Sequence, residues 1–507
     1  MSWQELRCES NSSNDETIRG IMMKDFKYSG SWWLPHSQKQ VTGDLTFSNQ
    51  DGLRLDLHDF LVEGRSFFEN AKDKRLSEFP IVLGMTKDGK LITLCDCVEV
   101  SVSMTVKNIG EGSISYSFAA YDAQAALVGA HFTDTQEMRF HRADIQYDYL
   151  PDFVRKHGFI INFETKEGQE YQYTYEYPSR VVATTSRGSV CISYTFHQGG
   201  NPLNGLILRQ STALEIRPQK ELTLKDMDLQ YLKPLQDLIS LATNRANSIT
   251  DLLVYSKEKV ETVMNRTLEV PIEVAFQQVQ YGQRQENLLP TSKLLFTLKD
   301  QVISDRFSEI IDRWLNHTNI TAELKDVFYL FFSVLYDPDL SPDMEFLSLA
   351  FAAELYHRRR FSNELLPENE HKERKKSIIN GAPEEHRRWL KDVLGFSNEP
   401  RFKNRVDELV EMTKPVVSPI FSDKDYFVKK VKDTRNYLVH KNPKLKKKAT
   451  EGEELYWTTK TLKYLVQTCL LVEVGLTSED CFMLLSKNKD YKLALERAPT
   501  FGPQHTS

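Results

Sequence analysis

The residues of this chain best suited to chemistry lie in the stretch RNYLVH at positions 435–440. A histidine can accept and release a proton near neutral pH, and an arginine presents a planar fork of N–H donors that fits a phosphate. Of the 12 histidines, only His440 has an arginine, Arg435, five positions before it. These residue types favour acid–base chemistry on an anionic substrate, so Arg435, Asn436 and His440 are the candidate catalytic residues.

Lysines surround this stretch. Residues 429–448 contain eight lysines and one arginine against one aspartate, a net charge of +8, whereas the whole chain has a formal net charge of −6. A patch this dense attracts polyanions. Four of its lysines are the candidate binding residues for such a ligand: Lys429, Lys432, Lys441 and Lys444. The plain alternative is a solvated helix end without a ligand.

A helix is expected to position the motif. Ser422 is a candidate N-cap, and Lys441 followed by Pro443 makes a helix end near His440 plausible. Residues five apart on a helix are rotated by about 140°, whereas residues four apart share a face. Asn436 is therefore predicted to orient the imidazole of His440. Arg435 reaches the same site only if the helix frays or the site lies at an edge.

A carboxylate on another helix is a second candidate. Glu354 lies beside the apolar face of the helix that begins at Ser341-Pro342, from where it can reach the motif and hold Arg435. A helix-surface carboxylate without a role is an equally good interpretation.

Length and composition limit the class of protein. A chain of 507 residues is long enough for two or three domains, and 40% hydrophobic with 27% charged residues is typical of a soluble globular protein. The six cysteines form no disulfide framework, the N-terminus has no apolar signal segment, and the longest apolar run, 327–336, is too short for a membrane. These three features predict a cytoplasmic protein. Phosphate-loop, dinucleotide and zinc-protease motifs are missing, so we also expect that it needs no cofactor and no metal.

The hydrophobic period changes once along the chain. Alternation with a period of two runs from about residue 26 to 218 and predicts an antiparallel β-sandwich or barrel-like domain, whereas helical periodicity begins near Thr223. The expected fold class is multidomain α+β. Its predicted parts are a β domain over 1–220, a helical connector over 221–300, an all-α domain over 301–490 and a disordered tail over 491–507. Residues 371–376 are expected to form a charged loop.

The motif also carries a family resemblance. Arg-Asn-x-x-x-His on a late helix resembles the HEPN superfamily, which includes metal-independent ribonucleases of toxin and antiphage systems. In the β half, GSWWLP at 30–35, GDL at 43–45 and GKLITL at 89–94 resemble the N-terminal domain of ApeA-like proteins. The resemblance implies bacterial abortive-infection defence, in which the β domain senses a phage component and the HEPN domain cuts RNA, with tRNA as the class that the family suggests.

The implied chemistry fits these residue types. A base takes the 2′-OH proton, the oxygen attacks the adjacent phosphate, and a 2′,3′-cyclic phosphate forms, with Arg435 holding the phosphate and Tyr437 in a supporting place. One histidine does not easily serve both sides of the phosphate, so a homodimer is expected. Two alternatives stay open. One is a non-catalytic HEPN module that binds RNA or a partner, and the other is a β domain that binds a small ligand or carbohydrate through Trp32 and Trp33.

Overall fold

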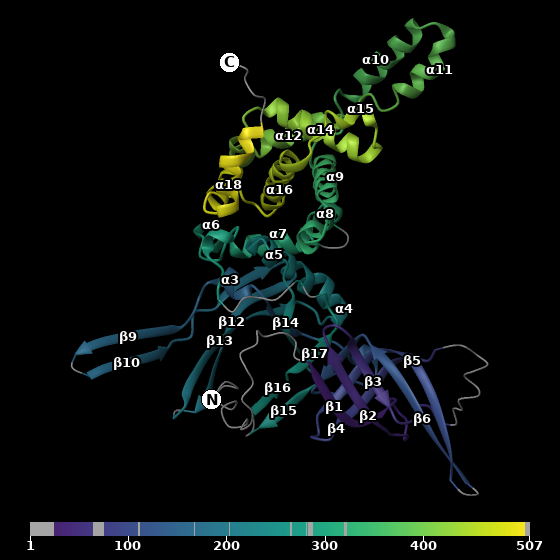
Figure 1. Ribbon diagram of the computed structural model, residues 1–507, viewed down its shortest axis with the longest axis vertical. Helices are drawn as coiled ribbons and strands as arrows, with labels where there is room; N and C mark the ends of the chain where they lie inside the picture. Colours follow the sequence, from purple (N-terminus) through teal and green to yellow (C-terminus); the bar gives the residue numbers. More distant parts are fainter. Residues whose placement is uncertain are drawn as a thin grey trace. The chain divides into compact units, whose positions relative to one another are not determined.

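The structure, a computed structural model, describes residues 25–63, 76–109, 112–166, 168–201, 203–263, 266–279, 281, 287–318 and 322–501. The chain forms two compact units (Figure 1). The β unit comprises residues 1–239 and 247–288, and the helical unit comprises residues 240–246 and 289–507. Cys8 and the terminal residues 502–507 lie outside the described residues.

Six strands of the β unit close into an antiparallel barrel. They follow the order β5-β4-β1-β2-β3-β6, and a further pairing of β5 with β6 completes the ring. Their bounds are β1 Phe26–Trp33, β2 Val41–Ser48, β3 Gly52–Leu57, β4 Glu78–Thr86, β5 Leu91–Ile109 and β6 Gly112–Ala123. The expected antiparallel, barrel-like N-terminal domain is confirmed.

Alternating apolar residues fill this barrel. Along β2, Val41, Gly43, Leu45 and Phe47 are buried while the residues that alternate with them are exposed or half-buried. Trp32 is fully buried, and its Nε1 donates a hydrogen bond of 3.2 Å to the carbonyl oxygen of Gly43. A Cβ at position 84 would collide with the ring of Trp32, so glycine is required there. Trp32 is therefore a core residue and is not available for the alternative ligand site that would use Trp32 together with Trp33.

The sheet continues beyond the barrel from β5 through β7, β17, β14, β8, β13 and β12 to β11. These strands span β7 Ala125–Val128, β8 Arg142–Tyr147, β11 Val181–Thr185, β12 Gly188–Asn201, β13 Gly205–Pro218, β14 Ile249–Tyr255 and β17 Ile272–Phe276. Two hairpins pair separately: β9 Phe159–Lys166 with β10 Gly168–Tyr175, and β15 Val260–Val263 with β16 Arg266–Glu269. The short helices η1 Thr135–Glu137 and α3 Leu150–Val154 join strands.

The predicted helical connector over 221–300 is wrong for its second half. Its start is helical: Thr223 caps α4 Leu224–Met227, and the π-helical turn η2 Asp228–Leu232 leads into α5 Lys233–Thr243 around Pro234. Residues 249–276 instead supply β14 to β17. β14 lies between β8 and β17, so Leu252 and Val254 are fully buried in the sheet. A central strand covered on both faces shows too little alternation to be separated from a helical segment by pattern alone.

The helical unit is built around two long helices. α16 Gly452–Glu473 is buried along most of its length and packs against α9 Pro342–Arg360. The remaining longer helices are α7 Phe307–His317, α8 Lys325–Tyr336, α10 Glu368–Gly381, α11 Glu384–Val393, α12 Phe402–Met412, α14 Lys424–His440, α17 Ser478–Leu485 and α18 Lys489–Arg497. The short ones are η3 Thr291–Lys293, α6 Gln301–Ser304, α13 Lys414–Val417, η4 Ser418–Ile420, α15 Pro443–Lys446 and η5 Ala498–Phe501. The predicted all-α C-terminal region is confirmed.

Two local predictions in this unit are wrong. The tail expected to be disordered over 491–507 is helical as far as Phe501, because Tyr491 and Ala494 of α18 are fully buried. The loop expected at 371–376 belongs to α10, which forms a hairpin with α11 that extends away from the other helices of the unit (Figure 1). Among the described helices, none combines the length and apolarity needed to cross a bilayer.

Candidate active site

The candidate motif, residues 435–440, occupies the last two turns of α14. The N-cap of this helix is Asp423, whose carboxylate accepts from the Tyr426 N–H at 2.9 Å, rather than the expected Ser422. The helix ends after His440, because Lys441 adopts a left-handed conformation (φ 48°) and donates its N–H to the Tyr437 carbonyl oxygen at 2.6 Å. The predicted helix end beside His440 is confirmed.

A polar stripe runs along the exposed side of α14. With 3.6 residues per turn, four of its residues fall within an arc of about 80°. They are Lys429, Lys432, Asn436 and His440. Lys429 and His440 are exposed, and the Lys432 side chain is 35% exposed and pairs with Asp433 at 2.8 Å. Two of the predicted binding lysines therefore share a face with the candidate base.

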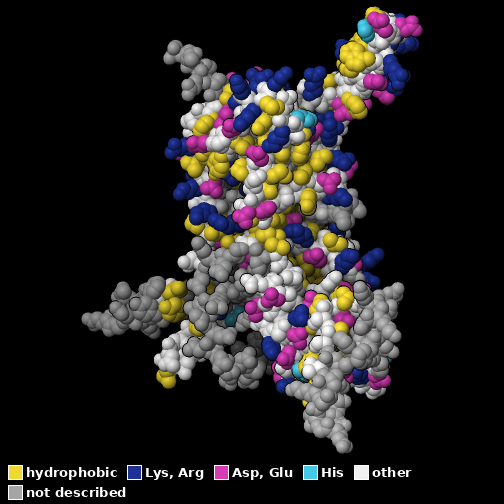
Figure 2. All heavy atoms as spheres, turned by 45° about the vertical axis from the view of Figure 1, so that its right-hand side comes forward, with side chains coloured by type: hydrophobic (Ala, Val, Ile, Leu, Met, Phe, Trp, Pro, Cys, Tyr) yellow, Lys and Arg dark blue, Asp and Glu magenta, His cyan; other side chains and the backbone are white. Residues whose placement is uncertain are grey.

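The other two candidate lysines follow the helix. Lys441 and Lys444 are exposed, and Lys441 forms an ion pair of 3.3 Å with Asp343. Lys441 also lies over the half-buried ring of Tyr437, with 5.3 Å between its Nζ and the ring centroid. Figure 2 shows Lys and Arg side chains on the end of the helical unit that carries α12, α14 and α15. The structure thus places a cationic surface around the end of α14.

Arg435 points away from this stripe and toward α9 and α12. Its guanidinium lies 5.3 Å from the ring centroid of Phe402 and 5.8 Å from that of Phe351. Its Nη2 contacts Glu354 Oε2 at 3.3 Å, so the predicted contact between Arg435 and Glu354 is present. The contact joins two half-buried side chains, 23% and 16% exposed. Glu354 is thus a half-buried carboxylate in contact with Arg435.

Asn436 contacts the arginine rather than the histidine. Its amide Oδ1 accepts from Arg435 Nη1 at 3.3 Å. Within the described part of the chain, no hydrogen bond joins Asn436 or Arg435 to the His440 imidazole. The proposed orientation of the imidazole by Asn436 is therefore absent from this structure, although both residues lie on the same helix face. Within one chain, Arg435 and His440 both lie near the C-terminal end of α14, but their side chains do not form a hydrogen bond with each other.

A buried polar cluster behind Arg435 was missed by the sequence reasoning. Arg405 of α12 and His357 of α9 are both fully buried, with Arg405 Nη1 3.0 Å from His357 Nδ1 and 2.6 Å from Asn363 Oδ1. His357 Nε2 lies 3.0 Å from Glu408. Burial lowers the pKa of His357. The hydrogen bond and charge of Glu408 act in the opposite direction, and the positive charge of Arg405 adds to the lowering. The sequence feature that could have indicated this cluster is the position of Arg405 among the apolar residues of α12.

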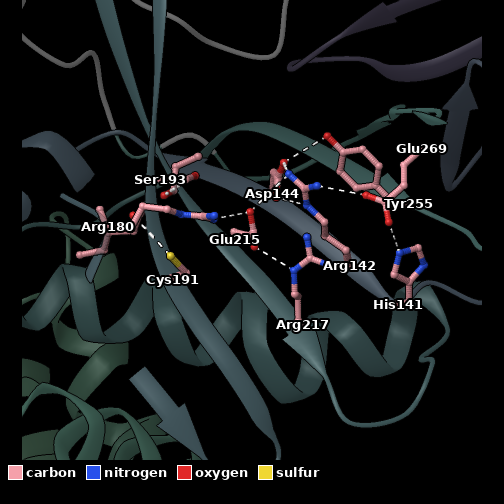
Figure 3. A network of polar contacts seen from close by, with 12 residues as sticks. His141, Arg142, Asp144, Arg180, Cys191, Ser193, Glu215, Arg217, Tyr255 and Glu269 are labelled. Carbon is pink, nitrogen blue, oxygen red and sulfur yellow. Dashed lines mark hydrogen bonds and ion pairs between the residues drawn. The ribbon is translucent and has the colours of Figure 1, made fainter. Parts of the chain in front are cut away.

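The β unit contains a second network, on strands β8, β12, β13 and β14 (Figure 3). Glu215, with its side chain 9% exposed, contacts Arg180 at 2.6 Å, Arg217 at 2.8 Å and Arg142 at 3.4 Å. Burial would raise the pKa of Glu215, but the hydrogen bond and charge of Arg217, together with the other two arginines, lower it.

The same network extends to β16 and involves further carboxylates. Arg142 holds Asp144 through two bonds of 2.9 and 2.6 Å, and Glu269 contacts both Arg142, at 3.1 Å, and His141, at 2.7 Å. Opposite charges two residues apart, as in Arg142 and Asp144, share a strand face, and this was the available sequence signal. Over the described residues, no group of three or more His, Cys, Asp or Glu side chains could hold a metal ion.

The helical unit with its basic Arg-Asn-x-x-x-His helix defines the class: residues 347–480 match the model of the Apea-like HEPN domain. Residues 27–314, more than half of the chain, match the model of ApeA N-terminal domain 1. The chain belongs to the family of ApeA-like HEPN proteins. No curated protein and no solved structure matches it.

Proposed function

We propose that this protein is a metal-independent HEPN endoribonuclease of antiphage abortive-infection defence. The family match supports an antiphage HEPN protein, and HEPN domains are usually nucleases. The observation that carries the proposal is the polar stripe of α14, in which an exposed histidine shares a helix face with two lysines. A half-buried arginine that lies near two aromatic rings precedes this histidine by five positions.

The reaction needs only the side chains of two copies of this site. His440 accepts the proton of a ribose 2′-OH, the O2′–P bond forms, the P–O5′ bond breaks, and a proton passes to the leaving 5′ oxygen. Arg435 stabilises the charge that builds on the phosphate oxygens, and Asn436 holds Arg435 through its amide oxygen. Lys429, Lys432, Lys441 and Lys444 bind the flanking phosphates of the RNA, which in this family we expect to be tRNA.

Two copies complete the site. Because Arg435 and His440 diverge within one chain, a second chain can supply the proton donor on the other side of the phosphate. An apolar stripe on α9 supports association, since Met344 is 49% exposed and Leu347, Phe351 and Leu355 are partly exposed on the same face. Figure 2 shows hydrophobic side chains gathered on one face of the helical unit. A phage component sensed by the β unit is the proposed trigger, in the cytoplasm.

The test is incubation of wild-type protein and His440→Ala with total RNA in EDTA, followed by mapping of the RNA ends. We expect 2′,3′-cyclic phosphate ends from the wild type and a loss of at least about 100-fold in the variant. Because His440 is exposed, we expect the variant to keep its fold, and circular dichroism checks this. Cleavage by His440→Ala at the wild-type rate contradicts the site. Salt-sensitive RNA binding without any cyclic phosphate identifies the alternative, a non-catalytic binding module.

A further inference from the structure

The donors of Arg435 are only partly used. Nη2 contacts Glu354 Oε2 and Nη1 contacts Asn436 Oδ1, both at 3.3 Å, which is long for a hydrogen bond. Nε is buried and has no acceptor within the described part of the chain. A guanidinium binds an oxyanion best through two parallel N–H groups on one edge. On the Nε–Nη2 edge, one donor is occupied by Glu354 and the other has no partner.

Arg435 does not depend on Glu354 for its position. Its guanidinium lies near two aromatic rings, those of Phe402 and Phe351, at distances typical of cation–π contacts. The backbone of Arg435 belongs to a regular turn of α14, which is anchored by the buried residues Val431 and Leu438. The ring contacts and the helix therefore still fix the guanidinium when the carboxylate moves away.

Glu354 has a second cation within reach. Its other oxygen, Oε1, contacts Arg358 Nη2 at 3.3 Å, one turn further along α9. Arg358 in turn contacts Glu399 at 3.1 Å, and Glu399 lies 3.8 Å from the buried Arg405. A carboxylate shared between two arginines can leave one of them and keep the other. The cost of releasing Arg435 is therefore smaller than for an isolated ion pair.

We propose that Glu354 is an intramolecular competitor of the RNA phosphate for the Nε–Nη2 edge of Arg435. In the resting protein its carboxylate occupies the place of a phosphate oxygen, and RNA binding transfers Glu354 to Arg358. This inference rests on the proposed function, in which Arg435 binds the scissile phosphate. It assigns to Glu354 an inhibitory role, opposite in sign to that of a residue that orients Arg435 for catalysis.

The test compares Glu354→Gln with Glu345→Gln. Glu345 is a matched control because it lies on the same helix, is 24% exposed and pairs with Lys460 at 3.6 Å. Affinity is measured with a 2′-O-methyl RNA oligonucleotide, which cannot be cut, and cleavage with the unmodified RNA below saturation. We expect Glu354→Gln to bind about three- to tenfold more tightly and to cut faster, and Glu345→Gln to change affinity less than about twofold.

Arg358→Gln separates a relay from a direct RNA contact. If Arg358 acts through Glu354, its substitution weakens RNA binding in the wild type and has no effect in Glu354→Gln. Unchanged or weaker binding by Glu354→Gln, or slower cleavage, overturns the competitor role and makes Glu354 a residue that positions Arg435. Failure of the wild type to bind the uncut RNA overturns the proposed function itself, so the two failures are distinguishable.

Discussion

Replacement of Arg435 by alanine should separate catalysis from stability. The change removes one ion pair between half-buried groups, worth up to about 1 kcal/mol, and contacts with two aromatic rings worth about 0.5 to 1 kcal/mol each. The expected loss in the free energy of unfolding is about 1 to 3 kcal/mol. Because domains are usually stable by about 5 to 15 kcal/mol, more than about 95% of the variant stays folded.

The effect on cleavage should be far larger than this. Removal of a donor that stabilises charge in a transition state costs about 100- to 1000-fold in rate. Unfolding of a few per cent of the molecules explains less than a 1.1-fold loss. The two quantities therefore differ enough for one experiment to assign the role of Arg435, provided that stability and cleavage are measured on the same preparation.

The assay pairs urea unfolding, followed by tryptophan fluorescence, with RNA cleavage in EDTA. Val428→Ala is the matched control, because this fully buried residue lies on α14 and its truncation costs about 1 to 3 kcal/mol without touching the polar stripe. We expect the control to cut RNA within about threefold of the wild-type rate. If Arg435→Ala loses less than about tenfold, or if both variants lose activity equally, the assignment of Arg435 to the phosphate is refuted.

Two further predictions concern charge. Lys429→Gln and Lys432→Gln should each reduce the slope of log RNA affinity against log salt concentration by about one. Lys414, which is 66% exposed on α13, is the control, and Lys414→Gln should leave this slope unchanged. Equal effects of all three substitutions would show that the polar stripe does not bind RNA. The pKa of buried His357 is lowered from 6.5, so on acidification the unfolded chain binds this proton before the folded chain does. The helical unit should therefore lose stability as the pH falls below 6.5 toward the lowered pKa. The urea midpoint should change less between about pH 5 and 8 in His357→Gln than in the wild type, and an identical change would contradict this reasoning.

The sequence predicted the elements whose pattern is local. The alternation of β2 and the start of helical structure near Thr223 depend on neighbouring residues, and both are present where expected. β14 could not be predicted in the same way, because its burial depends on β8 and β17, which are distant in the chain or separated from it by a hairpin. The tail was missed for a similar reason, since the buried Tyr491 packs against Tyr464 of α16, which is distant in the chain.

The candidate site shows the same limit. Residue types and spacing led to Arg435 and His440, and the helix end after His440 followed from Lys441 and Pro443. The orientation of Asn436 did not follow, because a position on a helix face does not specify the hydrogen-bond partner of an amide. Arg405 lies 30 residues before Arg435, and only the packing of α9 against α12 brings its cluster close to the motif.

The α10–α11 hairpin has a consequence for variation in this family. None of its helical residues is buried, and Trp389 and Phe396 are 63% and 79% exposed. Its two ends meet at one asparagine: Asn398 accepts from the N–H groups of Leu365 and Leu366 and donates to the Leu366 carbonyl oxygen, all at 2.8 to 2.9 Å. Since this closure fixes where the chain leaves and re-enters the bundle, evolution can lengthen, shorten or replace everything beyond it without repacking the other helices of the unit.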